Sequence, residues 1–216
     1  MVSWCLYFNT KKNYFSEIRK FTLKKIILIT FSIFLGCKHN NEANITPTFG
    51  IVIHGGAGTI LKENMSPEKD AEYRYVLSQA IKAGYNILKA GGSSQDAVEK
   101  TIHIMEDSPL FNAGKGAVLN AQGNIELDAS FMNGNSLDAG AVSGVKTVKH
   151  PISAAIKVME ASPHVMLSGS GADIFAKEEG LEIVNPEYFF TERRINDLKR
   201  VQERTTAFYE SLLSSE

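Results

Sequence analysis

The sequence predicts an α+β fold whose sheet is at least partly antiparallel. Helical and strand-like segments occur in blocks rather than in strict alternation, and two strand-like segments lie close enough along the chain to form a hairpin. The chain has 216 residues, of which 44% are apolar and 22% are charged, which is typical of a soluble globular domain. No basic patch is interleaved with aromatic residues, so the sequence does not indicate nucleic-acid binding.

The segment 1–37 differs in composition from the rest of the chain. Within it, LKKIILITFSIFLGC (Leu23–Cys37) has a basic start followed by about ten apolar residues, too few to span a bilayer but suited to a signal peptide. The small residue before Cys37 resembles a bacterial lipoprotein cleavage site, so Cys37 is the predicted lipid attachment site. An uncleaved anchor, a plain secretory signal and a buried core segment are the alternatives.

This leader predicts an exported protein, either in the bacterial periplasm or anchored to a membrane through its lipid alone. The following stretch, 38–48, is polar and without periodicity, as expected of a tether. Cys5 and Cys37 are the two cysteines of the chain. An exported part that begins at a lipidated Cys37 would therefore hold neither a disulfide nor a cysteine metal site.

The domain is expected to begin at residue 49 with a strand over Gly50–His54. A helix should follow, because Ser66 is a good N-cap, Pro67 suits the first helical position, and apolar residues recur at helical spacing. Gly91 and Gly92 indicate its end.

Ser93 and Asp96 form a capping arrangement that predicts a second helix. Its apolar face would consist of Val98, Ile102 and Met105. The remaining expected elements are a hairpin of 117–120 with 125–132, a strand over 139–148, a helix over 151–161, a strand over 164–167 leading into a glycine turn and helix, and a charged helix near the C-terminus.

The stretch GIVIHGGAGTI (Gly50–Ile60) ends in a loop rich in glycine. Glycine at this density indicates close approach of the backbone to another group, or positive φ. His54 with its glycines is similar to the oxyanion loop of α/β-hydrolases, but no serine lies in the Gly-x-Ser-x-Gly frame that α/β-hydrolases need. A phosphate-loop motif is also missing, and GSGADIF lacks the third glycine of a dinucleotide fingerprint. On spacing alone, a structural turn is favoured.

Two further stretches could hold functional groups. The loop in MEDSPLFNAGKGAV would expose backbone carbonyls, hard oxygen donors that can bind an alkali or alkaline-earth cation, although a plain turn is the simpler interpretation. In IELDASFMNG, Glu126, Asp128 and Ser130 share one strand face. They could be an acid–base pair with a neighbouring hydroxyl, or the solvated face of a sheet.

Five motifs of the sequence follow one another in the order and at the spacing of a known protein family. IVIHGGAG, PLFNAGKGAV, IELDASFMNG, AGAVSGV and HPISAAIKVMEASPHVMLSGSGADIFA together resemble the α-part of plant-type L-asparaginase/isoaspartyl peptidase, an N-terminal-nucleophile hydrolase family. The resemblance covers 49–195, and the five ordered motifs make it far more specific than any single one.

The resemblance implies an αββα sandwich of which only the N-terminal part is present. The family hydrolyses the side-chain amide of L-asparagine and isoaspartyl dipeptides, after a precursor cuts itself to free an N-terminal threonine. The resemblance also implies a partner β-subunit in an (αβ)2 assembly. Gly55, Gly56 and Asn112 would support the active site. A structural sodium ion would be bound by the main-chain carbonyls of Met105, Glu106, Ser108, Phe111, Ala113 and Lys115.

The nucleophile of the family has no counterpart here. The one Gly-Thr pair is Gly58-Thr59, and the residues after it cannot form the strand that a nucleophile would begin. Thr205 and Thr206 fall in a charged segment. We therefore expect 196–216 to be a helical linker that stops before the nucleophile. An inactive fragment, a binding lipoprotein that keeps the scaffold and, less favoured, a phosphate-binding module are the alternatives.

Overall fold

The computed structural model describes residues 49–56, 63 and 65–214. The predicted leader, the tether, Cys37 and the Gly58-Thr59 pair lie outside the described residues. Of the helices that are described, none is both long and apolar enough to cross a membrane.

Two serine caps begin helices α1 (Pro67–Lys89) and α2 (Ser94–Glu106), as the sequence predicts. The hydroxyl oxygens of Ser66 and Ser93 each accept a hydrogen bond from the backbone N–H three residues later. Each cap satisfies a donor that the first helical turn leaves without a partner.

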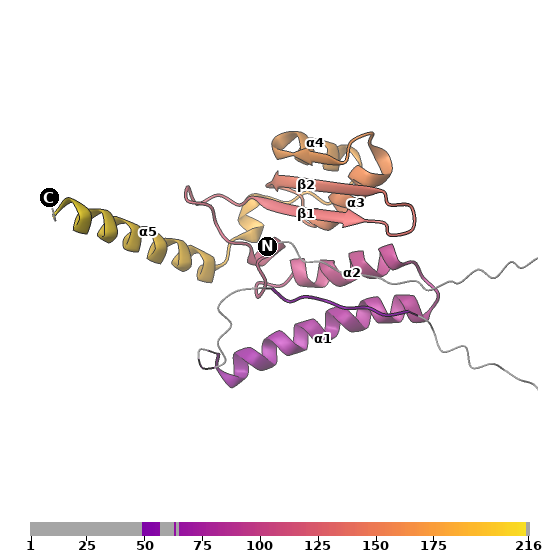
Figure 1. Ribbon diagram of the computed structural model, residues 1–216, viewed down its shortest axis with the longest axis horizontal. Coiled ribbons are helices and arrows are strands. Elements are labelled where there is room, and N and C mark those ends of the chain that lie inside the picture. Colours follow the sequence, from indigo (N-terminus) through magenta and orange to yellow (C-terminus); the bar gives the residue numbers. More distant parts are fainter. Residues whose placement is uncertain (1–48, 57–62, 64, 215–216) are drawn as a thin grey trace, which may run out of the picture. The chain divides into compact units, whose positions relative to one another are not determined.

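The turn between α1 and α2 is closed by backbone hydrogen bonds. The N–H of Gly92 donates to the carbonyl of Ile87 at 2.9 Å, and that of Gly91 donates to Leu88 at 3.0 Å. With Gly91 at a φ of 83°, this is a Schellman motif, which confirms the predicted glycine stop. Because the turn is short, α2 folds back along α1 (Figure 1).

A three-stranded sheet follows, with the order β1 (Leu127–Met132), β2 (Ala139–Val145), β3 (Met166–Ser168). β1 and β2 are antiparallel, whereas β2 and β3 are parallel and joined through α3 (Pro151–Ala161). The sheet is therefore partly antiparallel, as predicted, and α3 has the predicted bounds. The chain continues through α4 (Gly169–Glu178) and the short helix η3 (Pro186–Phe189) into α5 (Glu192–Leu213).

Two predicted strands are only partly present. In the stretch Gly50–His54, Val52 alone has bridge-type pairing, and its side chain is 67% exposed. The predicted hairpin is reduced to a single antiparallel bridge between Leu119 and Ile125 before β1 begins. The described sheet does not reach either segment.

β2 is shorter than the predicted strand over 139–148 because the chain bends after Val145, where the N–H groups of Lys146 and Thr147 donate to the carboxylate of Asp173. Within β2 there is also a bulge. Leu127 pairs with Val145 and Ala129 with Val142, so the register shifts between them. Gly144 lies in the distorted stretch with a φ of 65°. Such a bulge bends a strand and disrupts its pairing locally, and here the pairing resumes at Val145.

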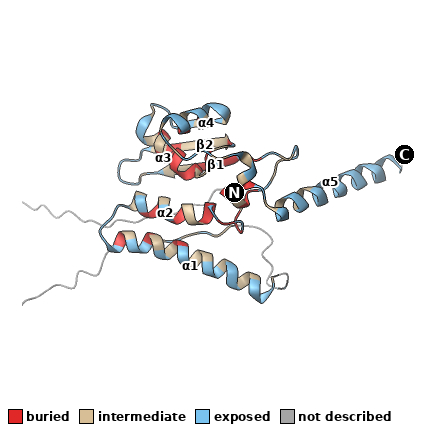
Figure 2. Cartoon of the chain, turned by 180° about the vertical axis from the view of Figure 1, so that it is seen from behind, coloured by how far each residue is buried: buried red, intermediate tan, exposed pale blue. Residues whose placement is uncertain are grey.

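The main apolar core lies between the sheet and the helices that follow it. Small residues of α3 and α4 pack against Val142 and Val145 of β2, which places the most buried stretch at α3 (Figure 2). These small helical residues are Ala154, Ala155, Ala172 and Ala176. On the opposite face of β1, Asp128, Ser130 and Met132 are exposed or half-exposed. A sheet with helices on one face is consistent with an α+β sandwich.

The closest approach of β2 to α3 predicts a stability effect at Gly140. A Cβ there would overlap the carbonyl oxygen of Ala155 and lie 2.5 Å from the backbone nitrogen of Met159. Gly140→Ala should therefore lower the free energy of unfolding by about 1–3 kcal/mol, measured from urea midpoints.

Gly134→Ala is the matched control, because a Cβ at Gly134 meets nothing within 4 Å. The free energy of unfolding of this variant should stay within about 0.5 kcal/mol of that of the parent chain. Equal midpoints for the two variants would contradict the close packing of α3 on β2.

Candidate functional site

The glycine loop that follows Ile53 lies against the loop that follows α2. A Cβ on Gly55 would be 3.2 Å from the Leu77 side chain of α1 and 3.7 Å from the ring of Phe111. Gly56 has a φ of 124°, in the region that favours glycine. Close approach explains the first glycine and backbone conformation explains the second.

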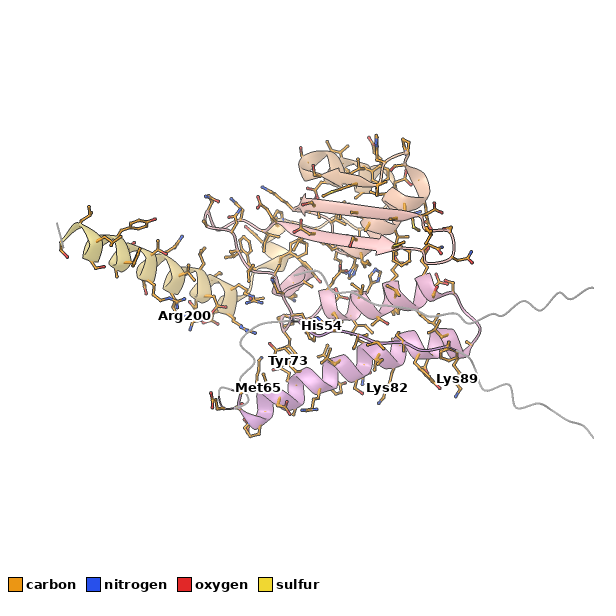
Figure 3. The ribbon with its side chains drawn as sticks, viewed as in Figure 1. His54, Met65, Tyr73, Lys82, Lys89 and Arg200 are labelled. Atoms are coloured by element: carbon orange, nitrogen blue, oxygen red, sulfur yellow. The ribbon has the colours of Figure 1, made fainter. Side chains whose placement is uncertain are left out.

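An apolar cluster supports both loops. Ile53, Tyr73 and Leu77 pack against the buried side chains of Met105 and Phe111. The rings of Tyr73 and Phe111 meet edge to face with centroids 5.7 Å apart. Figure 3 labels Tyr73 on α1 and His54, which is exposed and directly follows Ile53 in the chain. The two loops therefore share one support.

The loop over 107–116 is wound so tightly that two of its positions accept only glycine. A Cβ on Gly114, which has a φ of 50°, would overlap the carbonyl oxygen of Glu106. A Cβ on Gly116 would overlap the carbonyl oxygen of Phe111. Carbonyl groups are thus crowded toward the two glycines, which form the short helix η2 (Gly114–Gly116).

The six predicted cation donors all lie on this loop or at the end of α2. The carbonyls of Met105 and Ala113 accept hydrogen bonds from the N–H groups of Ser108 and Gly116, at 3.2 and 3.1 Å. A carbonyl oxygen has two lone pairs, so one that accepts a single hydrogen bond can also bind a cation. Met105, Glu106, Ser108 and Phe111 are buried, whereas Ala113 and Lys115 are half-buried.

Lys115 and Asn112 each have a defined partner. The ammonium of Lys115 lies 5.3 Å from the ring centroid of Tyr188, so its charge is turned to an aromatic face. The side-chain oxygen of Asn112 accepts a hydrogen bond from the N–H of Val118 at 2.8 Å. Asn112 therefore fixes the chain just after the loop, and its role toward a nucleophile stays a prediction.

Glu126 and Asp128 have structural partners on the solvated side of the sheet. Asp128 Oδ1 accepts hydrogen bonds from the hydroxyl of Ser143 at 2.7 Å and from the N–H of Gly144 at 2.9 Å. Glu126 lies 3.4 Å from the Lys146 ammonium, with both side chains half-exposed. This arrangement favours the solvated-face interpretation over an acid–base pair.

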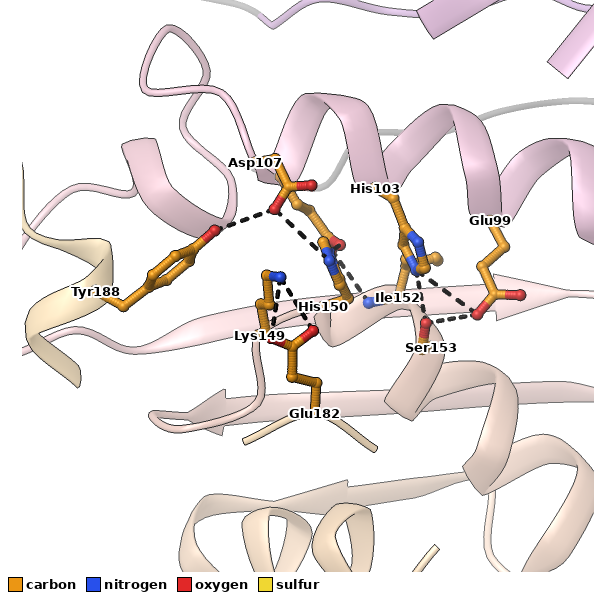
Figure 4. A network of polar contacts seen from close by, with 10 residues as sticks. Glu99, His103, Asp107, Lys149, His150, Ile152, Ser153, Glu182 and Tyr188 are labelled. Atoms are coloured by element: carbon orange, nitrogen blue, oxygen red, sulfur yellow. Dashed lines mark hydrogen bonds and ion pairs between the residues drawn. The ribbon is translucent and has the colours of Figure 1, made fainter. Parts of the chain in front are cut away.

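A polar network between α2 and α3 was not predicted from the sequence (Figure 4). Glu106 is 4% exposed, and its carboxylate accepts a hydrogen bond from the N–H of Ile152 at 3.1 Å and lies 3.1 Å from Nδ1 of His150. His103 Nε2 lies 2.7 Å from the hydroxyl of Ser153. The spacing of His103 and Glu106, one helical turn apart, was the one available sequence signal.

Burial shifts the acidity of both groups on α2. Desolvation raises the pKa of Glu106 to about 6, although the hydrogen bond with His150 opposes the shift. Desolvation lowers the pKa of His103 to about 4, and the nearby His150 adds to the effect. Both shifts favour the neutral form: His103 is therefore neutral at neutral pH, and Glu106 takes up a proton more readily than an exposed glutamate does.

His103, Glu106 and His150 each offer a donor atom, and these atoms lie within 4.8 Å of one another. However, the two imidazole rings are stacked, with centroids 4.0 Å apart and planes 22° apart. An ion bound to an imidazole lies in the plane of that ring, so two stacked rings cannot direct their lone pairs at one ion. Because these side chains already have protein partners, the network serves to fasten α2 to α3.

Comparison with known proteins agrees with the ordered motifs. The family model described as Asparaginase matches residues 47–213. The chain is 47% identical over 148 residues to an isoaspartyl peptidase of Salmonella typhimurium, covering 68% of this chain and 47% of the relative. It is 46% identical over 154 residues to a plant-type L-asparaginase of Pyrococcus horikoshii, covering 71% and 48%.

A rat isoaspartyl peptidase/L-asparaginase is 44% identical over 159 residues, which is 74% of this chain and 46% of the relative. The chain spans about half the length of the curated relatives it matches. The family model covers most of the described residues, including both loops of the site. The chain therefore belongs to the asparaginase family.

Proposed function

We propose that this chain is the α-part of a hydrolase that cleaves the side-chain amide of L-asparagine and isoaspartyl dipeptides. The observation that carries the proposal is the meeting of the glycine loop, at Gly55, with the loop at Phe111 in a chain of this family. The matched relatives are named as isoaspartyl peptidases and L-asparaginases. The substrate class of this chain is inferred from them.

The nucleophile of the proposed reaction lies outside this chain. A β-subunit would present an N-terminal threonine, freed by self-cleavage of a precursor, whose α-amino group acts as the base. Preorganised donors would stabilise the tetrahedral intermediate. Gly55 and Gly56 would let the backbone come close to this threonine, and Asn112 would help to hold it. The working assembly would be (αβ)2.

Activity measurements test this assignment. The chain alone should release no aspartate from an isoaspartyl dipeptide and no ammonia from asparagine, whereas co-expression with a β-subunit of a relative should give turnover. Thr59→Ala should have no effect on that turnover, because Thr59 is not the nucleophile. Turnover by the chain alone that Thr59→Ala abolishes would contradict the proposal. Substrate binding without turnover in the complex would favour a binding lipoprotein.

We also propose that the segment 105–115 holds a structural sodium ion through main-chain carbonyls. The chemistry of the six expected donors suits a hard cation, because all of them are neutral carbonyl oxygens. They lie on a segment that Gly114 and Gly116 allow to wind tightly. Side-chain charge is not needed, which suits the varied residues at these positions. Lys115 can contribute its carbonyl because its ammonium lies over the ring of Tyr188.

If the loop binds sodium, the melting temperature of the αβ complex should be higher in sodium chloride than in potassium or choline chloride. Pro109→Gly loosens the turn but keeps every carbonyl, so it should weaken this sodium dependence. Ser108→Ala is the comparison: it keeps the carbonyl and loses a hydrogen bond from the N–H of Leu110. Equal sodium dependence in the two variants would contradict ligation by backbone geometry.

For the leader, we propose that the chain is exported and anchored through a lipid on Cys37, with 38–48 as the tether. In its bacterial host, the parent protein should incorporate a labelled fatty acid, and Cys37→Ser should abolish both labelling and processing. Cys5→Ser is the matched control and should label normally. Normal labelling of the Cys37→Ser protein would rule out lipidation at this cysteine.

A further inference from the structure

Two consecutive arginines at the start of α5 are linked to the loop after α2 at two points, Leu110 and Gly116. Arg194 Nε donates a hydrogen bond to the carbonyl of Gly116 at 2.7 Å. Arg193 donates to the hydroxyl oxygen of Tyr73 at 3.2 Å, and that hydroxyl donates to the carbonyl of Leu110 at 2.9 Å. The segment between these two attachments is Leu110–Gly116, which contains Asn112.

The side chain of Arg194 is largely removed from solvent. Its side chain is 11% exposed, whereas that of Arg200, further along the same helix, is 70% exposed (Figure 3). Desolvation, with the charge of Arg193, lowers the pKa of Arg194. No residue of α5 is buried in the part of the chain described (Figure 2). The guanidinium of Arg194 is nevertheless partly removed from water, and a desolvated charge requires compensation. The carbonyl of Gly116 and the carboxylate of Asp197 supply it.

The carbonyl that Arg194 binds belongs to a tightly constrained part of the loop. The N–H of Gly116 already donates to the carbonyl of Ala113, and Gly116 has no room for a side chain. Two residues later, the N–H of Val118 donates to Asn112. A shift of Gly116 would therefore disturb the hydrogen bonds that hold Asn112 in place.

We propose that Arg194 is a positioning residue: by binding the carbonyl of Gly116, it holds Leu110–Gly116, and with it Asn112, in the shape that the site requires. α5 thereby serves as a latch on the loop. Only the catalytic importance of this role rests on the proposed function. The mechanical role can be measured without any activity.

Amide hydrogen exchange in the full chain tests the latch. Arg194→Ala should speed exchange of the loop amides of Gly116, Ala117 and Val118 by about tenfold or more, because a hydrogen bond to a charged donor is lost. Exchange of amides in α3 should not change. Arg194→Lys keeps the charge and should restore part of the protection. Arg204→Ala is the matched control: Arg204 is exposed and donates to the carbonyl of Arg200 within α5, so exchange should change at neither place.

Two outcomes would overturn the proposal. One is loop exchange in Arg194→Ala that is no faster than in Arg204→Ala. The other is an equal acceleration of exchange in α3, which indicates a general loss of stability. In an active αβ complex, Arg194→Ala should lower kcat more than it raises KM. Failure to obtain any active complex would count against the proposed function and leave the exchange result as the test of the latch.

Discussion

The buried carboxylate of Glu106 is the constraint on which the arrangement of the described elements depends. A carboxyl group at 4% exposure is tolerated only when its oxygens are hydrogen-bonded, and here the partners are the N–H of Ile152 and the ring of His150. Separating α2 from α3 would leave this buried group without these partners. Since α2 packs along α1 and α3 covers the sheet, the same contact relates the helical pair to the sheet.

The constraint also determines where the functional loop begins. Asp107 follows Glu106 directly and binds the hydroxyl of Tyr188, so the first residue of the loop is held from both sides (Figure 4). At its other end the loop is held by Arg194. The proposed cation site would need this kind of anchorage, because backbone carbonyls alone would form it.

Local signals made most helices predictable. Ser66, Ser93 and the Gly91-Gly92 pair act through hydrogen bonds within a few residues, and the structure confirms all of them. The strand over Gly50–His54 was harder to predict, because an apolar run favours a strand but does not identify the strand that would pair with it. Strand pairing depends on residues distant in the sequence, whereas helix caps do not.

The site divides in the same way. The glycine-rich motifs identified both loops, but the contacts that hold them join residues that sequence patterns do not connect. Glu106 and His150 are 44 positions apart, and Arg194 and Gly116 are 78 positions apart. Pattern reading placed Glu126 and Asp128 on one face correctly, yet only their partners showed that the face is structural.

The position of α5 in the chain has a consequence for the order of folding. α1 packs on α2, β1 pairs with β2, and α3 packs on both strands, so these contacts join neighbours in sequence and can form while the chain is still being synthesised. The bond from Arg194 to Gly116 cannot form until α5 has been made. The loop would then reach its final shape last, after the scaffold around it is complete, so that a chain interrupted before residue 194 would have a folded body and an unfinished loop.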